Sequence, residues 1–302
     1  RVCASTGVCV SVNNSLFADG VYKFGTEDQR QRFLPPMGDS RAQACISLSE
    51  PGAGTDVGST LTTATKDGDS WVLNGKKNFA TNGGFADFAL VLVSTDQQAG
   101  HKGLSMFIVD KGTPGFSVGR HELKLGIRGS DTSELLFDDC RVPESSMLGS
   151  PGKGLSIALT ILNGGRIGIA AQAIGIGQAA YEDAVAYSKE RQQFGKPISE
   201  FQAVAFKLAD MAVELEAAKL LTLKAAWLKD QGQDYITASA KAKLFASEAA
   251  NRIATEALQI HGGYGYIRDF NVERYFRDAR ITTIYEGTSE AQRIVISRDV
   301  LR

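Results

Sequence analysis

The sequence predicts an α+β protein in which a middle β-domain precedes a C-terminal four-helix bundle. Two changes of pattern along the 302 residues support this fold class. Residues 41–150 consist of short apolar or β-branched runs separated by turn residues, whereas residues 151–302 repeat apolar side chains at helical spacing. Residues 1–40 are mixed in composition and are interpreted as the C-terminal part of an N-terminal helical domain. The predicted domains are therefore 1–40, 41–150 and 151–302.

The first segment is predicted to be helical up to Pro35-Pro36, because proline cannot continue a helix. The sequence starts at Arg1 rather than at a methionine, and residues 2–12 already have the pattern of an ordered element. We therefore expect further sequence before Arg1, where any targeting segment would lie. There is no signal-peptide pattern in the residues given. The scattered cysteines favour reduced thiols, so we expect an intracellular protein, in the cytoplasm if the source is bacterial and in the mitochondrial matrix if it is eukaryotic.

The middle domain is predicted to hold six short strands that form a small barrel or sandwich. Asp67-Gly68 marks a hairpin between two of them. Phe88–Val93 is the longest apolar stretch of the chain and fits a buried strand. The predicted strands are Ala44–Ser49, Leu61–Lys66, Trp71–Leu73, Phe88–Thr95, Leu104–Asp110 and Glu134–Asp139.

The last domain is predicted to hold four helices with short connections, which indicates an antiparallel bundle. The four helices cover roughly 154–191, the stretch after Ser199, 236–259 and the stretch after Thr288. Ser199 is the expected N-cap of the second helix, and Gln202 would complete a capping box with it.

The first of these helices contains a pattern that imitates a dinucleotide-binding fingerprint. Gly175–Ala180 matches G-x-G-x-x-A, but this fingerprint is meaningful only between a strand and a helix. We therefore interpret its glycines as points of close contact between helices.

Composition excludes several classes of protein. The formal net charge is −1, so the chain lacks the basic excess that a nucleic-acid-binding surface needs. No apolar run reaches the roughly 18 residues of a membrane span. The four cysteines lack CxxC spacing and the three histidines are scattered, which argues against a metal site and favours reduced thiols.

Several stretches could bind a ligand, although each also has an ordinary structural explanation. Ser49–Asp56 is a loop with exposed N–H groups that suits a polar cofactor edge, or is simply a tight turn. Phe79 could pack on a flat heterocycle or in a core. Arg191 follows a helix end, where the helix dipole favours a cation in any case. Asn163–Arg166 places two glycines in a helical pattern, which a close ligand or helix would explain.

Glu286 is the candidate general base. It lies before the expected N-cap Thr288 or Ser289, between the apolar Ile284 and the flexible Gly287. A carboxyl that is partly desolvated beside an aromatic residue would have a raised pKa, as a base working near neutrality needs. The alternative is a solvated acid near a helix N-terminus, and the local sequence favours neither.

Six collinear motifs resemble the acyl-CoA dehydrogenase family, and its short-chain (butyryl-CoA) members most closely. The motifs are LSEPGAGTD, LGIRGSDT, ERQQFGKPI, QIHGGYGY, RDARIT and IYEGTSE, and the resemblance covers essentially the whole chain. It implies an N-terminal helical domain, a middle β-domain, a C-terminal four-helix bundle and assembly as a tetramer.

The resemblance also implies an FAD cofactor and an acyl-CoA substrate. FAD would contact Phe79, Ala80, Thr81, Thr288, Ser289 and Glu290, and the loop Ile46, Ser47, Leu48, Ser49, Glu50, Pro51, Gly52, Ala53, Gly54 and Thr55. The FAD of a neighbouring subunit would contact Arg191, Gln202, Gln259, Ile260, His261, Gly262 and Gly263. The acyl-CoA would contact Thr55, Asn163, Gly164, Gly165, Arg166 and Gly287.

By the same resemblance, Glu286 takes the α-proton while a β-hydride passes to flavin N5, which gives the trans-2-enoyl-CoA. The electrons would pass to electron-transferring flavoprotein. Family members with a base on the bundle helix carry it at the position of Gly165, which cannot serve here. Two residues depart from the family pattern, because Phe79 replaces a tryptophan and Asn163 an acidic residue. The alternatives are an oxidase-like enzyme that uses oxygen, or an inactive scaffold.

Overall fold

A computed structural model describes residues 2–302, and the chain divides into two compact units. The β unit contains residues 8–123 and 128–165. The helical unit contains the residues up to Gly7 together with 124–127 and 166–302. Each unit is described in turn.

Helices precede the sheet, and the first of them, α1 (Ala4–Ser11), has its residues up to Gly7 in the helical unit and the rest in the β unit. Helix α1 continues through a π-helical segment (Val12–Ala18) into α2 (Asp19–Phe24), and α3 (Glu27–Gly38) follows. Thr26 and Gln29 form a capping box at the start of α3. The Gln29 side chain also donates to the carbonyls of Ser145 (2.8 Å) and Met147 (2.9 Å), which ties this helix to the end of the sheet.

The prediction that the helix ends at Pro35-Pro36 is wrong, because α3 includes both prolines and ends at Gly38. They lie in the last turn, so the two hydrogen bonds lost with their N–H groups are at the end of the helix rather than in its interior. The Asp39 N–H still donates to the Pro35 carbonyl over 3.0 Å and closes that turn.

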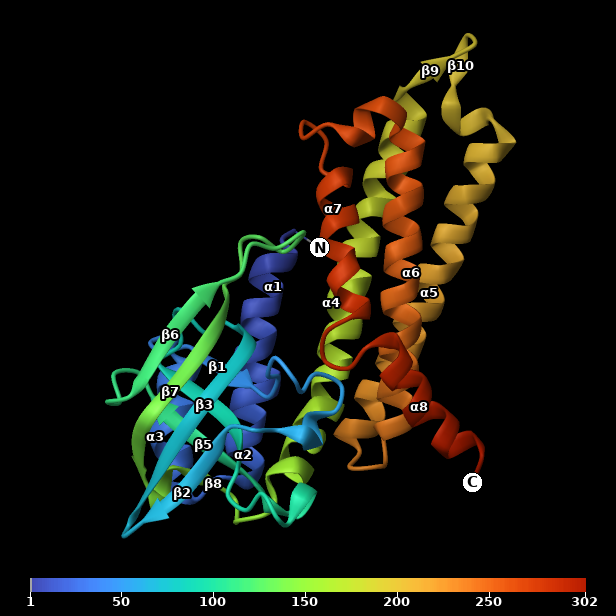
Figure 1. Cartoon of the computed structure of the whole chain (residues 1–302). Coiled ribbons are helices and arrows are strands. Elements are labelled where there is room, and N and C mark those ends of the chain that lie inside the picture. The colour runs from blue at the N-terminus through green and yellow to red at the C-terminus, as the bar shows by residue number, and fades with distance from the viewer. Residues whose placement is uncertain (1) are drawn as a thin grey trace. The chain divides into compact units, whose positions relative to one another are not determined.

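Eight strands form one sheet in the order β6-β7-β3-β2-β4-β5-β8, with β1 paired to β4 (Figure 1). The strands are β1 (Ala44–Ser47), β2 (Thr63–Asp67), β3 (Ser70–Thr81), β4 (Phe88–Ser94), β5 (Leu104–Asp110), β6 (Phe116–His121), β7 (Thr132–Pro143) and β8 (Met147–Leu148). All six predicted strands are present. β6 and β8 were missed, because β6 is mostly exposed and without alternation, and β8 has only two residues.

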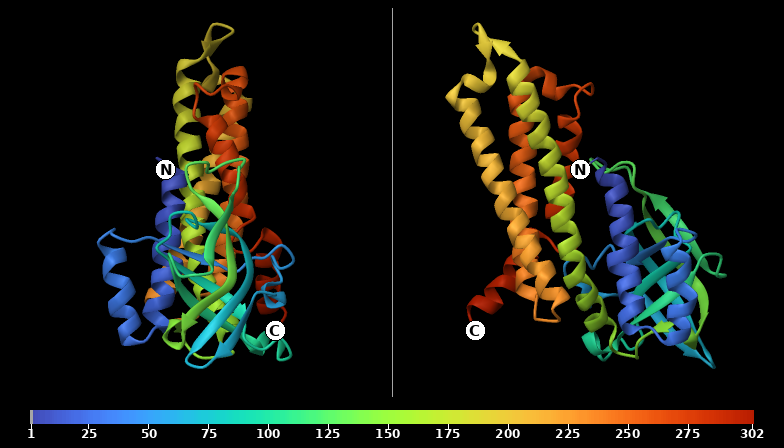
Figure 2. Two further views of the ribbon diagram at one scale, coloured as in Figure 1. Left: turned by 60° about the vertical axis from the view of Figure 1, so that its left-hand side comes forward. Right: turned by 180° about the vertical axis from the view of Figure 1, so that it is seen from behind.

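The sheet bends into two halves that share one core. Only the pair Thr63–Ser94 joins β2 to β4. On the inner side, Trp71 of β3 packs edge-on against Phe107 of β5 with ring centroids 5.6 Å apart. This arrangement agrees with the prediction of a small barrel or sandwich. Phe17 and Phe33 pack on Phe88, so the helices cover the other side of β4 (Figure 2).

The helical unit is built around three long helices. These are α4 (Gly154–Glu190), whose first twelve residues belong to the β unit, α5 (Gln202–Asp230) and α6 (Ile236–His261). A short hairpin, β9 (Gln192–Gln193) and β10 (Lys196–Pro197), joins α4 to α5 (Figure 1). The chain continues through α7 (Val272–Ala279) to α8 (Ser289–Val300). The four predicted helices are thus present, and the short α7 was missed.

The G-x-G-x-x-A sequence at Gly175–Ala180 lies inside α4, as predicted. A Cβ on Gly177 would lie 3.3 Å from Leu215 of α5 and 3.6 Å from the backbone of Ala250 in α6. The glycine therefore allows three helices to approach one another. The predicted capping box at Ser199 and Gln202 is wrong, because Ser199 lies in a 3₁₀ turn and the N-cap of α5 is Phe201.

Among residues 2–302, α4 is the one helix whose length and composition would allow it to cross a membrane. Half of its most apolar 18-residue window is buried inside the protein, as expected for the central helix of a bundle.

Candidate active site

Glu286 lies in a tight turn between a 3₁₀ segment (Arg280–Thr283) and α8. Its φ is 50° and that of Gly287 is 88°, so two consecutive residues adopt left-handed conformations. This is uncommon for a residue with a Cβ. Thr288 then caps α8, since its side chain accepts from the Ala291 N–H at 3.3 Å. The predicted N-cap is confirmed.

The Glu286 carboxyl is desolvated and faces two cations. Its Oε2 is buried without a hydrogen-bond partner. Burial raises the pKa of Glu286 to about 7, although the positive charges of Lys243 and Arg166 oppose this rise. Of the two alternatives that the sequence left open, the structure favours the desolvated acid over the solvated one.

Arg166 of α4 is 7% exposed, and its Nε and Nη1 are buried without hydrogen-bond partners. Burial lowers the pKa of Arg166, and the charge of Glu286 partly counteracts this effect. In native proteins, the buried N–H groups of a guanidinium nearly always donate to a hydrogen-bond acceptor. These two N–H groups therefore point to a ligand that brings acceptor atoms.

Lys243 of α6 was not predicted as a site residue. It is 0% exposed, and its Nζ donates to the Gly287 carbonyl over 2.7 Å. Burial lowers the pKa of Lys243 to about 8, with Glu286 opposing this effect. A signal existed in the sequence, because Lys243 stands on the apolar face of α6 with Ala240, Ala246 and Ala250 at helical spacing.

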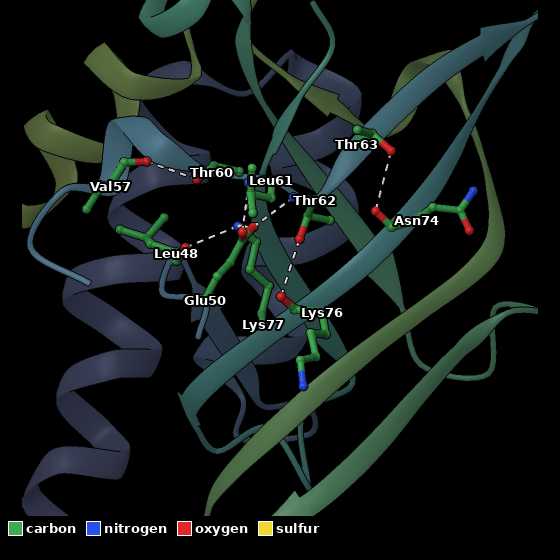
Figure 3. A network of polar contacts seen from close by, with 10 residues as sticks. All are labelled: Leu48, Glu50, Val57, Thr60, Leu61, Thr62, Thr63, Asn74, Lys76 and Lys77. Carbon is green, nitrogen blue, oxygen red and sulfur yellow. Dashed lines mark hydrogen bonds and ion pairs between the residues drawn. The ribbon is translucent and has the colours of Figure 1, made fainter. Parts of the chain in front are cut away.

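In the β unit, the loop Ile46–Thr55 is anchored from within. The Lys77 ammonium donates to Glu50 Oε1 over 2.7 Å and to the Leu48 carbonyl over 3.1 Å (Figure 3). The same carboxylate accepts from the N–H groups of Leu61 (2.7 Å) and Thr62 (3.0 Å). The Glu50 side chain is thus fully engaged inside the β unit.

This ion pair changes the pKa of both partners. Burial raises the Glu50 pKa, but Lys77 and the backbone donors outweigh it and hold that pKa below its ordinary value. Burial lowers the pKa of Lys77 to about 8, against the charge of Glu50.

Phe79 lies at an irregularity of β3 and points away from the core. The pairing with β7 shifts register between Lys77 and Ala80, and Phe79 has a φ of 60° and a 63% exposed side chain. A β-bulge commonly redirects a side chain in this way. Nearby, Ser47 Oγ and Asn78 Oδ1 are buried without hydrogen-bond partners. An exposed ring and unpaired polar atoms fit a planar, polar cofactor such as FAD.

Five of the predicted cofactor residues line one cavity of the helical unit, of about 490 Å³. They are Arg191, Ile260, His261, Gly262 and Gly263. His261 stacks on Tyr187 with ring centroids 4.2 Å apart, and burial lowers its pKa. Arg191 lies over the Tyr264 ring at 5.4 Å.

The remaining predicted residues are elsewhere. Gln259 lines a separate cavity of about 340 Å³ with Tyr266 and Phe276. Gln202 is exposed at the start of α5 and lines neither cavity. Asn163, Gly164 and Gly165 occupy the part of α4 that belongs to the β unit, whereas Gly287, Ser289 and Glu290 follow Glu286 in the helical unit. Ser289 Oγ is buried without a hydrogen-bond partner.

Comparison with known proteins places this geometry in a family. Three family descriptions match along the chain: "Acyl-CoA dehydrogenase, N-terminal domain" over residues 1–41, the middle domain over 45–140 and the C-terminal domain over 152–301. The human mitochondrial short-chain specific acyl-CoA dehydrogenase is 52% identical over 302 residues, which is all of this chain and 73% of the relative. The short-chain specific enzyme of Clostridium acetobutylicum is 49% identical over all of this chain and 80% of its own length.

Solved structures agree with the sequence relatives. Butyryl-CoA dehydrogenase from Megasphaera elsdenii superposes with a TM-score of 0.98 at 48% identity, covering 99% of this chain and 79% of that one. A chain in a structure described as the electron transferring flavoprotein of Acidaminococcus fermentans has the same TM-score at 50% identity, covering 99% and 78%. The chain therefore belongs to the acyl-CoA dehydrogenases, a family of FAD-dependent oxidoreductases.

Proposed function

We propose that the protein oxidises a short-chain acyl-CoA to the trans-2-enoyl-CoA, with Glu286 as the base that removes the α-proton. The observation that carries this proposal is that Glu286 Oε2 is buried without a hydrogen-bond partner, on a half-buried side chain whose pKa is raised by burial to about 7. A general base is most effective when its pKa lies near the working pH. The names of the short-chain relatives support the substrate class.

The two buried cations suit the charge that the reaction creates. When Glu286 accepts the α-proton it becomes neutral, and the remaining electron pair spreads over the acyl thioester as enolate-like charge. Because Glu286 is then neutral, it no longer balances the positive charges of Arg166 and Lys243. Fixed charges in a desolvated site stabilise such developing charge strongly. FAD, held by the residues named below, would supply the acceptor for the hydride that leaves the β-carbon.

The residues that would hold FAD are those of the predicted set. Ile46–Thr55, Phe79–Thr81 and Thr288–Glu290 would serve the cofactor of the same chain. The unpaired hydroxyls of Ser47 and Ser289 and the exposed Phe79 ring support these assignments. Glu50 is a special case, because its carboxylate is committed to Lys77 and the backbone. We therefore assign it to shaping the loop.

The acyl-CoA would lie against Thr55, Asn163–Arg166 and Gly287. Arg166 has the clearest support, because its buried Nε and Nη1 lack acceptors. Gly165 occupies the position on α4 at which some other family members carry the base, and glycine cannot take that role.

Assembly as a homotetramer would supply the second set of FAD contacts, which includes Arg191, Gln202 and Gln259–Gly263. An exposed apolar stripe on α5 supports an interface between copies. It consists of Phe206, Val213, Leu220, Leu223 and Trp227. Four of these residues recur every seven positions, so they share one face of the helix, and a large exposed apolar patch usually marks an interaction surface.

The electrons would leave through electron-transferring flavoprotein, as the similar chain in the Acidaminococcus fermentans structure suggests. The compartment would be the mitochondrial matrix or a bacterial cytoplasm, because relatives of both origins match.

Anaerobic flavin reduction tests the proposal. The holoenzyme is mixed with saturated acyl-CoAs from C4 to C16, and bleaching of the flavin absorbance is followed. We expect the fastest bleaching at the short end, and a loss of at least about 1,000-fold for Glu286→Gln. Glu144→Gln removes an exposed carboxyl that lies outside every predicted binding stretch, so this variant should leave the rate unchanged.

Equal bleaching by the Glu286→Gln variant and the parent would show that Glu286 is not the base. Rapid reoxidation of the reduced parent by oxygen, without electron-transferring flavoprotein, would instead identify the oxidase-like alternative.

A further inference from the structure

The turn that carries Glu286 has an unfavourable backbone and therefore needs support. Glu286 and Gly287 have φ values of 50° and 88° in succession. Glycine adopts such a conformation freely, but a residue with a Cβ persists in it only where its surroundings fix it. The conformation of Glu286 is thus a property of its neighbours as well as of its own sequence.

Two buried side chains hold the carbonyl groups of this turn. Lys243 Nζ of α6 donates to the Gly287 carbonyl over 2.7 Å. Gln292 Nε2 of α8 donates to the same carbonyl over 2.9 Å and to the Glu286 carbonyl over 3.4 Å. Gln292, like Lys243, is fully buried. Two helices therefore fix the turn from the carbonyl side.

The hydrogen bond to one neutral carbonyl does not offset the free-energy cost of burying the Lys243 ammonium. The free energy gained from one hydrogen bond to a charged group is smaller than the free energy needed to desolvate an ion, even after relaxation. The charges that act on Lys243 are those of Glu286, Arg166, Glu248 and Glu290. The charge of Glu286 has the largest effect of the four, so the Lys243 ammonium interacts with the Glu286 carboxyl as well as with the Gly287 carbonyl.

The second cation that acts on the carboxyl is Arg166 of α4, whose pKa is also affected by Tyr235. Arg166 and Lys243 are the charged groups that act on Glu286, and both favour its ionised form. Removing either one should therefore make the carboxyl harder to ionise.

We propose that Lys243 and Gln292 are positioning residues for Glu286. Both side chains fix the left-handed turn through its carbonyl groups. Lys243 also favours the ionised form of the Glu286 carboxyl. This inference rests on the proposed role of Glu286 as the base. It predicts that replacing either residue changes the orientation of the turn. Only replacement of Lys243 should also change the ionisation of Glu286.

The test titrates the Glu286 carboxyl by infrared difference spectroscopy of the holoenzyme, using the band that Glu286→Gln lacks, and measures kcat and KM against pH. Lys243→Met should move the carboxyl midpoint and the acid limb of kcat to higher pH, by about one unit or more. Its kcat should fall about 10- to 100-fold, because a misplaced base is inefficient.

Gln292→Met should lower kcat about tenfold and leave the midpoint in place, since it removes no charge. Lys243→Gln keeps an amide donor without the charge, so it should shift the midpoint while retaining more of kcat than Lys243→Met. Lys241→Met, on the exposed side of the same helix, is the matched control and should behave as the parent.

The inference is overturned if the Lys243 variants keep the parent's carboxyl midpoint, or if Gln292→Met keeps the parent's kcat per bound flavin. The infrared midpoint reports on Lys243 even if the protein proves not to use Glu286 as its base. Undiminished bleaching by Glu286→Gln would refute the proposed function separately. If Lys243→Met does not fold, the carboxyl midpoint is compared between Lys243→Gln and the parent, and kcat is compared between Gln292→Met and the parent.

Discussion

Lys77 and Glu50 form a buried ion pair, with Nζ and Oε1 2.7 Å apart and the two side chains 0% and 4% exposed. The pair joins three pieces of the β unit. Lys77 precedes the bulge that exposes Phe79, Glu50 lies in the loop after β1, and the carboxylate also accepts from the backbone at Leu61 and Thr62. Two segments expected to contact FAD are thus connected through one interaction.

Lys77→Met should destabilise the β unit strongly, because it leaves the Glu50 carboxylate buried without its cation. Breaking a buried pair in this way costs about 3–5 kcal/mol. The double variant Lys77→Met with Glu50→Gln should recover part of that loss, since no charge is then left uncompensated. Denaturant unfolding of the holoenzyme and of the flavin-free protein measures both effects.

Lys76→Met is the neighbouring control, because Lys76 makes a half-exposed pair with Glu134 at 3.3 Å. Exposed pairs contribute about 1 kcal/mol at most. If the Lys77 and Lys76 variants lose equal stability, the buried pair does not have the role assigned to it.

Gly126→Ala should destabilise the helical unit by about 1–3 kcal/mol through overpacking. A Cβ at Gly126 would overlap the backbone carbonyl oxygen of Arg277, which belongs to α7 and has little room to move. The next residue, Ile127, donates its N–H to the buried Asp278 carboxylate over 2.5 Å, so the segment cannot easily withdraw.

Gly7→Ala is the opposite case and tests the same reasoning. Gly7 lies in α1, and nothing lies within 4 Å of a Cβ added there. Alanine is favoured over glycine in a helix by about 1 kcal/mol, so this variant should be more stable than the parent. Thermal melts of both variants decide the matter, and a stabilising Gly126→Ala would contradict the packing argument.

Leu220→Arg should weaken self-association, because it places a charge in the exposed apolar stripe of α5. Sedimentation equilibrium should show a parent larger than the 32.3 kDa chain and a variant shifted toward that mass. Leu123→Arg changes a more exposed leucine outside the stripe and should leave the mass unchanged. A monomeric parent would contradict the proposed assembly.

The sequence predicted the fold well where local signals agree with tertiary packing. Strands β4 and β5 are continuous apolar runs, and Gly177 allows close helix contact inside a long helical pattern. The failures have local causes. Pro35 and Pro36 are tolerated in a last turn, and Ser199 and Gln202 fit a capping box that the 3₁₀ segment before α5 does not form.

The candidate site was harder to predict, because its electrostatics depend on residues distant in sequence. Glu286 was recognisable, but Lys243 lies 43 positions earlier and reaches the site only because α6 packs beside the turn. Glu50 shows the reverse problem: it belongs to a loop that the sequence predicts to contact FAD, yet its carboxylate is bound to Lys77. Motif spacing identifies such a segment but not the direction of each side chain.

Glu286→Gln should stabilise the folded protein at pH 8 while leaving it nearly unchanged at pH 5. The pKa of Glu286 is raised from 4.5 to about 7 by burial, so between these values the folded state holds a proton that the unfolded state has lost. Stability therefore falls as pH rises through this window, by about 3 kcal/mol in all. Glutamine does not ionise and escapes this loss.

The measurement is the free energy of unfolding at several pH values between 5 and 8. For Glu290→Gln no gain at pH 8 is expected, because the pKa of Glu290 is lowered by hydrogen bonds at the start of α8. A constant difference between the Glu286→Gln variant and the parent across the range would mean that Glu286 is not a desolvated carboxyl. A gain confined to higher pH would mean that the fold gives up stability to keep a carboxylate where the proposed reaction needs one.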